Sequence, residues 1–449
     1  MTVTLNVFNV AVILGLFILT YVGIIHPQID KTLAAVVGAI AATLAIILFL
    51  RIPDPHDPTH TIAEDGLLHF TDLEIIALII GTLIIVDIAQ DSGVFHFLSI
   101  KILKASKGDP RRLLYYFGAL TVVLSAMVNN ISAMMIVGSL TLIACERLEL
   151  DPKPYIITEL SMTTTGGIVT LISSVPNIII SQIFGITFVS FLVVGAPLGF
   201  LTMVITFAIF IPLLKIQKAK DPELMAMKVA DFDEWSAVKD RKSFYRSVII
   251  LSATILAFVF SQQLGLSLAM IAVTGGFIMI MASGKKLELV FEKLDWHLVA
   301  FFLGLFMFIN ALDVVQVLDF VAVQMTLILP ESTFWAATIL LWMTALISGI
   351  VDNIVVAAAF GPILFTIATG ANGFQPGLIA WAAIFGANFG GGITPIGAPS
   401  AIIGLSLLYR KTGEKIGWGE FIKTQGIATI ARLVATTIYL ALLFSIGVF

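Results

Sequence analysis

The sequence Ser125-Ala126-Met127-Val128-Asn129-Asn130-Ile131 interrupts a long apolar segment with two adjacent asparagines. A second long apolar segment is interrupted in the same way by Val351-Asp352-Asn353-Ile354. The two segments, residues 113–147 and 333–369, are too long for one membrane-spanning helix, which needs about 20 residues. Each is therefore predicted to form two half-helices that meet at a polar tip, as a re-entrant hairpin does. Such a tip is tolerated at membrane depth only where it is buried in protein or lines a cavity.

Composition places the rest of the chain in a membrane as well. Of the 449 residues, 59% are hydrophobic and only 12% are charged, whereas soluble domains carry about 25% charged residues. The net charge of −4 gives no reason to expect a nucleic acid partner, and the single cysteine, Cys145, excludes an internal disulfide. The sequence has no His-Glu-x-x-His motif, and its glycine-rich runs lie inside apolar spans, so we do not expect an enzyme.

Apolar segments of suitable length predict the remaining spans. They lie near residues 6–26, 31–50, 73–100, 155–184, 187–214, 247–263, 266–284, 295–318, 376–409 and 421–447. With hairpins that do not cross, each half of the chain crosses the bilayer five times. The predicted fold class is an all-α polytopic membrane protein with about ten transmembrane helices and two re-entrant hairpins.

The two halves also resemble each other in sequence. At an offset of 223 residues, Val128-Asn129-Asn130-Ile131 falls on Val351-Asp352-Asn353-Ile354, and Gly81 falls on Gly304. An odd number of crossings in each half requires the second copy to be inverted, as in many transporters. The predicted organisation is an N-terminal repeat (1–214), a cytoplasmic linker (215–246) and a C-terminal inverted repeat (247–449).

Basic residues predict the orientation of the chain through the positive-inside rule. Four clusters are predicted to share the cytoplasmic side, and they lie at Lys101–Lys153, Lys215–Arg246, Lys285–Lys293 and Arg410–Lys415. No Lys or Arg occurs between Lys293 and Arg410. The termini are therefore predicted outside, with the first hairpin opening inward and the second outward. The expected location is the inner or plasma membrane of the cell.

The segments 155–184 and 376–409 are each predicted to contain a broken helix. Glycines and prolines interrupt both, and Gly166-Gly167-Ile168-Val169-Thr170 falls on Gly390-Gly391-Gly392-Ile393-Thr394 at an offset one residue larger. Carbonyls at the C-terminus of a half-helix bind cations, and half-helix N-termini attract anions. An alternative is that the glycines only allow close helix packing. The residues predicted to form a substrate or ion site near the midplane are Asn129, Asn130, Thr164, Thr165, Gly166, Thr170, Asn177, Asp352, Asn353, Asn388, Gly391, Thr394 and Ser400.

Carboxylates inside a membrane are costly and therefore are functional candidates. Asp352, at the second tip, is the leading candidate for binding either a proton or a cation, and Glu159, before the first break, is a second proton-coupling candidate. A structural role in capping or hydrogen bonding is the alternative for both. No Lys or Arg is placed at the site, which disfavours an anion clamp, although amides and helix N-termini can bind anions unaided. A cation or a neutral hydroxylated solute fits the site at least as well. A Na⁺ ion at Asn130, Asp352 and Asn353 is the only bound cofactor considered.

These residues resemble the ion transporter superfamily, specifically its arsenite permease and sodium–proton antiporter branch (ArsB/NhaD), which is related to the DASS family. The resemblance extends over nearly the whole chain. It implies a homodimer in which each subunit has a scaffold and a mobile transport part that moves by an elevator mechanism. It also implies that substrate and coupling ions bind at the tips and breaks, at Asn129, Asn130, Thr165, Asn177, Asp352, Asn353, Thr394 and Ser400.

The chain departs from the pattern of this family at two places. The family often has an acid where this chain has Asn129, and the acid usual before Pro-Pro-Asn is absent from Ser173-Ser174-Val175-Pro176-Asn177. The leading hypothesis is exchange of a small inorganic ion, with Na⁺ as first candidate, for protons at Asp352. The alternatives are arsenite or antimonite efflux, Na⁺-coupled symport of a dicarboxylate or sulfate, and an ion channel. One cysteine argues against capture of arsenic by thiolates.

Overall fold

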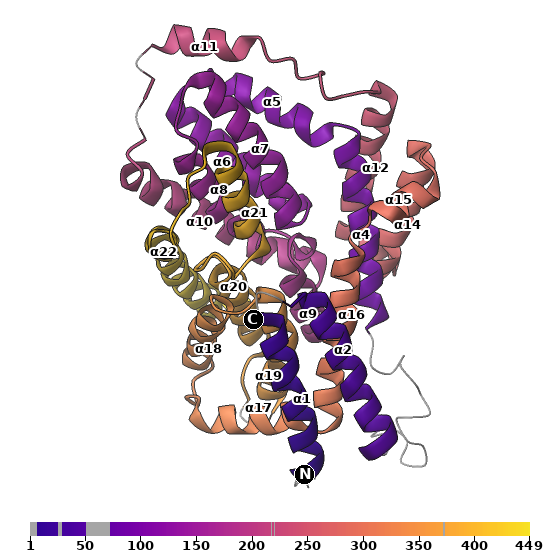
Figure 1. Cartoon of the computed structure of the whole chain (residues 1–449). Helices are drawn as coiled ribbons and strands as arrows, with labels where there is room; N and C mark the ends of the chain where they lie inside the picture. Colours follow the sequence, from indigo (N-terminus) through magenta and orange to yellow (C-terminus); the bar gives the residue numbers. More distant parts are fainter. Residues whose placement is uncertain (1–6, 26–28, 51–71, 217, 220, 371–372) are drawn as a thin grey trace.

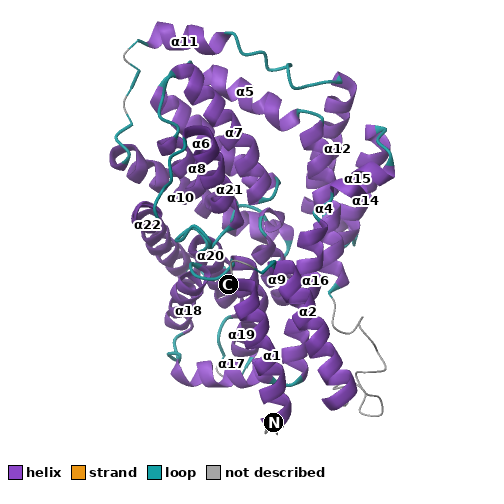
Figure 2. Ribbon diagram, in the orientation of Figure 1, coloured by secondary structure: helices purple, strands orange, loops and turns teal. Residues whose placement is uncertain are grey.

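The structure is a computed structural model that describes residues 7–25, 29–50, 72–216, 218–219, 221–370 and 373–449, and within these ranges it is helical without a β-strand (Figures 1 and 2). The helices of the first half are α1 (Val7–Ile25), α2 (Lys31–Leu44), η1 (Ala45–Leu50), α4 (Leu73–Asp91), α5 (Val94–Ser106), α6 (Pro110–Met127), α7 (Asn130–Leu148), α8 (Lys153–Gly166), η3 (Leu171–Ser173), α9 (Val175–Phe184) and α10 (Phe188–Leu213). Those that follow are α11 (Pro222–Ala230), α12 (Arg241–Val259), α13 (Ser261–Leu264), α14 (Leu268–Ser283), α15 (Leu287–Lys293), α16 (Trp296–Val314), α17 (Val317–Ile328), α18 (Thr333–Ser348), α19 (Asn353–Thr369), α20 (Pro376–Gly390), α21 (Pro399–Thr412) and α22 (Trp418–Ser445).

Many of these helices have the length and composition of membrane spans. By these criteria α4, α7, α10, α12, α16 and α22 could each cross a bilayer, and α17 with α18 meets the same criteria as a pair bent by 119°. Shorter apolar helices, among them α2, α14 and α20, pack beside them. The chain is therefore an all-α polytopic membrane protein, as its sequence predicts.

The helices pack as two bundles. We call α1, α2, α4, α12, α14 and α16 the straight-helix bundle, because these helices pack mainly against one another. We call α6–α10 with α18–α22 the hairpin bundle, which contains both predicted hairpins and both broken helices. Figure 1 shows α4, α12 and α14 toward the right and α6, α8, α10 and α22 toward the left.

The contacts between helices repeat in the two halves. In the straight-helix bundle α4 packs on α14, and its counterpart α16 packs on α2; in the hairpin bundle α6 packs on α8, and α18 on α20. The closest approaches coincide as well. A Cβ atom on Gly81 would lie 2.4 Å from the backbone carbonyl carbon of Ala272, and one on Gly304 would lie 2.8 Å from that of Ala35. The two glycines that align in sequence therefore occupy equivalent packing positions in the fold.

Two segments predicted as single spans, near 73–100 and 295–318, are each divided into two helices. The first divides at Gly93, whose φ of 85° is left-handed, into α4 and α5. The second divides at Gln316, also left-handed with a φ of 61°, into α16 and α17. Gly93 and Gln316 are equivalent under the 223-residue offset, so the extra turn is a feature of the repeat that apolar composition alone does not reveal.

Ion pairs attach the four basic clusters to neighbouring segments on one face of the molecule, which we call the basic face. The linker is attached to the first cluster by Lys104 with Glu234 (2.9 Å) and by Lys228 with Glu149 (2.8 Å). The base of the first hairpin also contacts the linker, since Arg111 Nε donates to the carbonyl of Ile216 (2.9 Å). The linker helix α11 lies at the opposite end of the molecule from the N-terminus (Figure 1).

The other two clusters are connected in the same manner. Lys153 pairs with Glu414 (2.6 Å), which places the fourth cluster beside the first. Asp91 receives both Lys285 (2.5 Å) and Lys293 (2.6 Å) at the end of α4. The four clusters that the positive-inside rule groups together are thus neighbours in the fold, while their assignment to the cytoplasm stays a prediction.

Candidate functional site

The first hairpin turns at Val128 and Asn129, between the end of α6 and the start of α7. Asn129 has an extended backbone, and its side-chain oxygen accepts the N–H of Ser132 at 2.8 Å. It is therefore the N-cap of α7, a position that favours Asn, Asp and Ser. The next residue, Asn130, begins the helix, and its side-chain oxygen contacts the hydroxyl of Ser125.

The second hairpin turns in the same way between α18 and α19. Asp352 is the N-cap of α19, and its carboxylate accepts the N–H of Ile354 at 3.0 Å. Its other oxygen lies 3.6 Å from Lys31 Nζ on α2, in the straight-helix bundle. Asn353 is the first residue of α19 and is buried. The two tips are alike in backbone, but the second carries a charge that a lysine neutralises.

Each tip is attached to a helix break by the same pair of hydrogen bonds. Thr170 Oγ1, in the first break, donates to the carbonyl of Ala126 (2.6 Å), and Thr394 Oγ1, in the second, donates to that of Gly349 (2.6 Å). On the other side of each break, Ser125 Oγ contacts the carbonyl of Thr163 (2.8 Å), and Ser348 Oγ that of Ala387 (2.6 Å). Both predicted threonines therefore hold a hairpin tip against a break.

Both breaks fall where the sequence predicts them. α8 ends at Gly166 and α9 begins at Val175, whereas α20 ends at Gly390 and α21 begins at Pro399. Cβ atoms on Gly166 and Gly390 would collide with the hairpin helices α6 and α18. Close packing of helices is thus one role of these glycines, and the change of chain direction after them is another.

Two asparagines connect the breaks across the two halves. Asn388 Nδ2 donates to Asn177 Oδ1 (2.7 Å), and Asn177 Nδ2 donates to the carbonyls of Gly167 (2.7 Å) and Thr170 (3.0 Å). Asn388 Oδ1 is buried and has no hydrogen-bond partner within the described ranges. Thr163 Oγ1 lies 3.4 Å from Ser400 Oγ, which adds a second contact between the halves.

The remaining predicted residues lie around this connection. Thr165 Oγ1 donates to the carbonyl of Ser161 (3.1 Å) in its own helix. A Cβ on Gly391 would lie 2.9 Å from the carbonyl oxygen of Gly397, which explains the need for glycine there. The residues considered for Na⁺ stand on two different tips, Asn130 on the first and Asp352 with Asn353 on the second.

Glu159 is fully buried in the middle of α8. Its Oε1 contacts the hydroxyl of Thr141 on α7, and its Oε2 has no partner in the part of the chain that the structure describes. It stands beside the hairpin and away from both cavities described below. Its role in proton coupling stays a prediction.

An arginine at the breaks contradicts the prediction that no Lys or Arg is near the site. Arg432, on α22, is fully buried and donates through Nη1 to the carbonyl of Ser161 (3.0 Å) and to Thr164 Oγ1 (2.6 Å). Its guanidinium lies over the ring of Phe389, 5.1 Å from the ring centre. Among intramembrane charges, only the carboxylates were predicted to be functional candidates. Applied to the apolar segment 421–447, the rule that an intramembrane charge is costly would have singled out Arg432.

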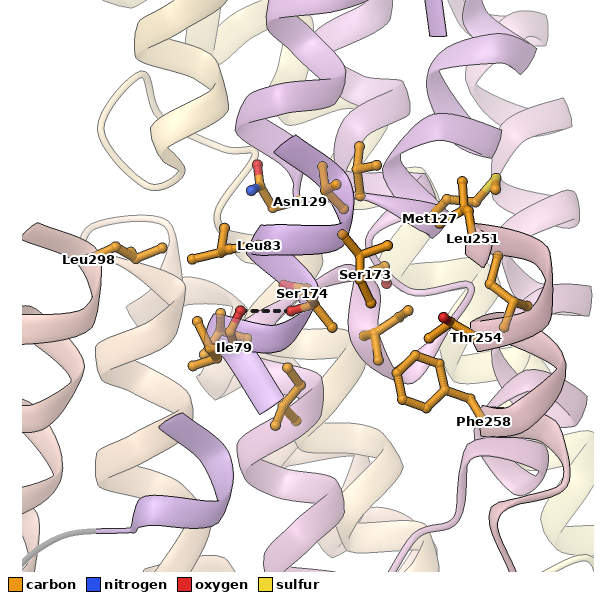
Figure 3. Close-up of a pocket in the computed structure, with 18 residues that line it drawn as sticks. Ile79, Leu83, Met127, Asn129, Ser173, Ser174, Leu251, Thr254, Phe258 and Leu298 are labelled. Atoms are coloured by element: carbon orange, nitrogen blue, oxygen red, sulfur yellow. Dashed lines mark hydrogen bonds between the residues drawn. The ribbon is translucent and has the colours of Figure 1, made fainter. Parts of the chain in front are cut away.

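A cavity of about 70 Å³ lies between the two bundles, at the first tip and the first break (Figure 3). Figure 3 shows Thr254 and Phe258 of α12 on one side and Leu83 of α4 on the other, with Ser173 and Ser174 between them. The N-terminal caps of two helices, Asn129 of α7 and Ser174 of α9, line it. None of its 18 lining residues, all of them in the described part of the chain, is charged.

A larger cavity of about 210 Å³ lies on the other side of Asn129. It is lined by Asn129 and Ser132 of α7, by Asp87 of α4, and by Lys293 and Asp295 near the basic face. Asn129, Leu83, Val86 and Leu298 line both cavities. The first tip is therefore approached from the basic face through a vestibule that is lined by both charged and apolar side chains.

Among the described residues, the corresponding space in the other half is small. Aligning the halves on Gly304 with Ala35 and on Gly81 with Ala272 places Phe17 and Tyr21 of α1 where α12 has Thr254 and Phe258. Phe17, Tyr21 and Gly304 line a space of only about 10 Å³ beside Val355. Phe17 stacks on Tyr21 (5.8 Å between ring centres), which fills this side. The two repeats therefore share a fold but differ in the size of the cavity beside the hairpin tip.

Paired hairpins, paired helix breaks and an internal repeat define a class of polytopic membrane transporters. The fold matches the solved structure of the YdaH transporter of Alcanivorax borkumensis with a TM-score of 0.64, covering 93% of this chain and 99% of that chain at 16% sequence identity. The chain belongs to the citrate transporter family (CitMHS), whose family model matches residues 14–386 and 340–448. This confirms the resemblance to the ion transporter superfamily.

Relatives of known sequence agree with this assignment. The 46 kDa membrane protein of Mycobacterium leprae is 29% identical over 425 residues, which cover 94% of this chain and 96% of that protein. The uncharacterized transporter Rv2684 of Mycobacterium tuberculosis is 27% identical over 430 residues, 95% of this chain and 96% of the relative. The chain is accordingly a membrane transporter.

Proposed function

We propose that this transporter carries small anions, with carboxylates as the first class to test, coupled to the movement of a cation by an elevator-type motion. The observation that carries the proposal is the cavity at the first tip. It is lined by the N-terminal caps of α7 and α9 and by no carboxylate among the described residues. Helix N-termini present free N–H groups and a partial positive charge, which favour an anion.

Two further observations support an anion. Arg432 adds a buried positive charge at the breaks, where the sequence had suggested none. The family model that matches the chain is described as a citrate transporter. The contacts of Arg432 also remove the argument that an anion clamp is disfavoured because no Lys or Arg lies at the site.

The difference between the two halves supports alternating access. The cavity at the first tip lies between the bundles and continues toward the basic face, whereas the equivalent space at the second tip is filled by aromatic rings. We propose that the hairpin bundle moves against the straight-helix bundle, so that each space opens in turn. We place the basic face in the cytoplasm, and we propose a homodimer built on the straight-helix bundles.

Exchange of Na⁺ for protons at Asp352 is the second candidate function. It is favoured by the pairing of Asp352 with Lys31, because an ammonium beside a carboxylate occupies a position that a Na⁺ ion could take. In that mechanism the first tip, with uncharged Asn129, would serve the fold only. Arsenite efflux is the third candidate function, since hydroxyl and amide groups can bind neutral arsenous acid.

One pair of matched substitutions separates these functions. Asn129→Asp and Asp352→Asn each exchange an amide and a carboxylate at equivalent N-caps, and both residue types cap a helix equally well. In proteoliposomes, we expect Asn129→Asp to lower uptake of labelled citrate or succinate at least tenfold. The added carboxylate repels an anion in the adjacent cavity, and about 1.4 kcal/mol suffices for a tenfold effect.

The two candidate functions predict that different substitutions damage transport. If the transporter exchanges Na⁺ for protons, Asp352→Asn abolishes sodium-driven proton movement and Asn129→Asp does not. If it carries anions, Asn129→Asp is the damaging change, while unfolding temperatures stay close to that of the unmodified protein. Anion uptake that is unchanged in Asn129→Asp would contradict the proposal.

A further inference from the structure

The helix breaks leave two helix C-termini inside the hairpin bundle. α8 ends at Gly166 and α20 ends at Gly390, and both last turns are buried. A helix C-terminus carries roughly half a negative charge on its free carbonyls. Two such ends buried together in a low-dielectric interior attract a cation, and in broken-helix transporters coupling ions bind at ends of this kind.

Arg432 lies beside the last turns of both helices. At α8, Nη1 donates to the carbonyl of Ser161 (3.0 Å) and to Thr164 Oγ1 (2.6 Å), within the last turns of the helix. At α20, its guanidinium covers the ring of Phe389, and Nη2 would lie 3.5 Å from a Cβ on Gly392. Nη2 also donates to Thr429 (2.8 Å) on its own helix.

Among the described residues, this arginine has no acidic partner to neutralise it. No carboxylate in the described ranges lies within ion-pair distance of Arg432, and its Nε has no hydrogen-bond partner there. A buried charge without a partner of opposite sign is expensive unless dipoles stabilise it. The carbonyl of Ser161, the hydroxyls of Thr164 and Thr429 and the ring of Phe389 stabilise the charge at this position, and the last turns of α8 and α20 add their dipoles.

The first half of the chain has no arginine at the position equivalent to Arg432. When Phe188 is aligned with Trp418, as their sequences suggest, Thr202 of α10 is the residue equivalent to Arg432 of α22. Thr202 Oγ1 bonds only to carbonyls of its own helix, those of Leu198 and Gly199. One arginine, from the second half only, therefore serves both breaks.

The geometry points to Arg432 as a fixed internal cation that occupies, between the C-termini of α8 and α20, the position of a coupling cation. It sets the ion specificity of the transporter, because its charge excludes a monovalent metal ion from these two helix ends. The inference deepens the proposed anion transport and rests on it, since a permanent positive charge here favours an anionic substrate. Any coupling cation must then bind elsewhere, at the tips or as a proton.

The test measures the thermal stability of the purified protein in detergent with Na⁺, K⁺ or N-methylglucamine at equal ionic strength. We expect Arg432→Gln and Arg432→Ala to gain a Na⁺-dependent rise in Tm of roughly 2 °C or more beyond the rise that the unmodified protein shows, because a cation can then enter and stabilise the folded state. Arg432→Lys keeps the charge and should respond like the unmodified protein.

A matched control lies on the same pair of helices. Gln425 of α22 contacts α8 through neutral hydrogen bonds, from Ser161 Oγ (2.5 Å) and to the carbonyl of Ile157 (2.7 Å). Gln425→Leu should lower Tm without any new response to Na⁺. A gain in Gln425→Leu, or no gain in Arg432→Gln and Arg432→Ala, would overturn the inference.

The order of stability of the variants is a second readout. If the fold needs a positive charge at this position, Arg432→Lys should be more stable than Arg432→Gln. If it needs only the hydrogen-bond geometry of arginine, Arg432→Lys should have no such advantage. If Arg432→Lys is no more stable than Arg432→Gln, or if neither folds, the inference is rejected. None of these outcomes depends on which anion is transported, so failure of the proposed function is seen separately, in the uptake by Asn129→Asp.

Discussion

At the scale of single residues, the two hairpin tips differ mainly in charge. Asn129 and Asp352 occupy equivalent N-caps, yet only Asp352 contacts a lysine of the other bundle. The ion pair between Lys31 and Asp352 joins the two bundles at the second tip, the tip whose adjoining space is small. We therefore expect it to affect access to the second tip more than the stability of the fold.

Removal of either partner should show this. Lys31→Met and Asp352→Asn each break the pair, and a partly exposed pair is worth at most about 1 kcal/mol of stability. We expect small changes in Tm, but equal changes in transport rate, and no further change in the double variant. Effects that simply add in the double variant would show that the two residues act independently.

The sequence predicted the positions of the tips and breaks because polar residues, glycine and proline inside apolar segments are costly in lipid. It predicted neither the contact of Lys31 with Asp352 nor the place of Arg432 between two helix ends. Those contacts join residues that are distant in sequence, and which helices are neighbours is decided by packing. The extra helices α5 and α17 were missed because the turns that precede them, Gln90 to Gly93 and Asp313 to Gln316, contain polar residues but were included in the predicted spans.

At the scale of helices, the fold depends on the close approach of α4 to α14 and of α16 to α2. Alanine at Gly81 or Gly304 would place a Cβ against backbone atoms of the partner helix, which cannot move aside as a side chain can. We expect Gly81→Ala and Gly304→Ala to destabilise the protein by about 1–3 kcal/mol each. Thermal unfolding in detergent measures the effect.

A third glycine provides the control for this prediction. Gly426 lies within α22, and no heavy atom lies within 4 Å of the Cβ that alanine would add. Gly426→Ala should be neutral or slightly stabilising, because alanine is the better helix former by up to about 1 kcal/mol. If Gly81→Ala were equally well tolerated, the α4–α14 contact would not be as tight as described.

The linker docks on α5 through a contact that depends on pH. The hydrogen bond from Lys104 lowers the pKa of Glu234 below its ordinary value, and Trp235 packs on Phe97 with 4.6 Å between ring centres. A depressed carboxylate pKa means that the contact is present at neutral pH and is lost as the pH falls through that pKa. We expect Trp235 fluorescence to change on acidification, and to change at pH 7 in Lys104→Gln.

The origin of that signal can be verified directly. Trp235→Phe should remove the acid-dependent component and leave the fluorescence of the other five tryptophans. The same acid-dependent change in Lys104→Gln as in the unmodified protein would assign it to groups other than Glu234.

At the scale of the whole molecule, the repeat predicts where the two access routes lie. Ser132 lines the open vestibule, and its counterpart Val355, under the 223-residue offset, lines the closed space. With the buried Cys145 replaced by alanine, we expect Ser132→Cys to react with a small thiol reagent at least ten times faster than Val355→Cys. Membrane-impermeant reagents added to either side of proteoliposomes reveal which face each route reaches.

The ratio of the two cysteine reaction rates should also change when the closed space at the second tip is opened. Lys31→Met, which removes the pair at the closed end, is expected to raise the reactivity of Val355→Cys. Equal reactivity of the two cysteines in every background would argue against two alternating routes.

The charge of Arg432, which pairs with no carboxylate in the described ranges, has a consequence for the electrical behaviour of the carrier. If the hairpin bundle moves across part of the membrane, this guanidinium moves with it through the transmembrane potential, where a full crossing by one charge amounts to about 2.3 kcal/mol per 100 mV. A resting potential that is negative inside then draws the unloaded carrier inward. A bound monovalent anion would cancel that pull, so that the membrane voltage acts on the empty carrier more than on the loaded one.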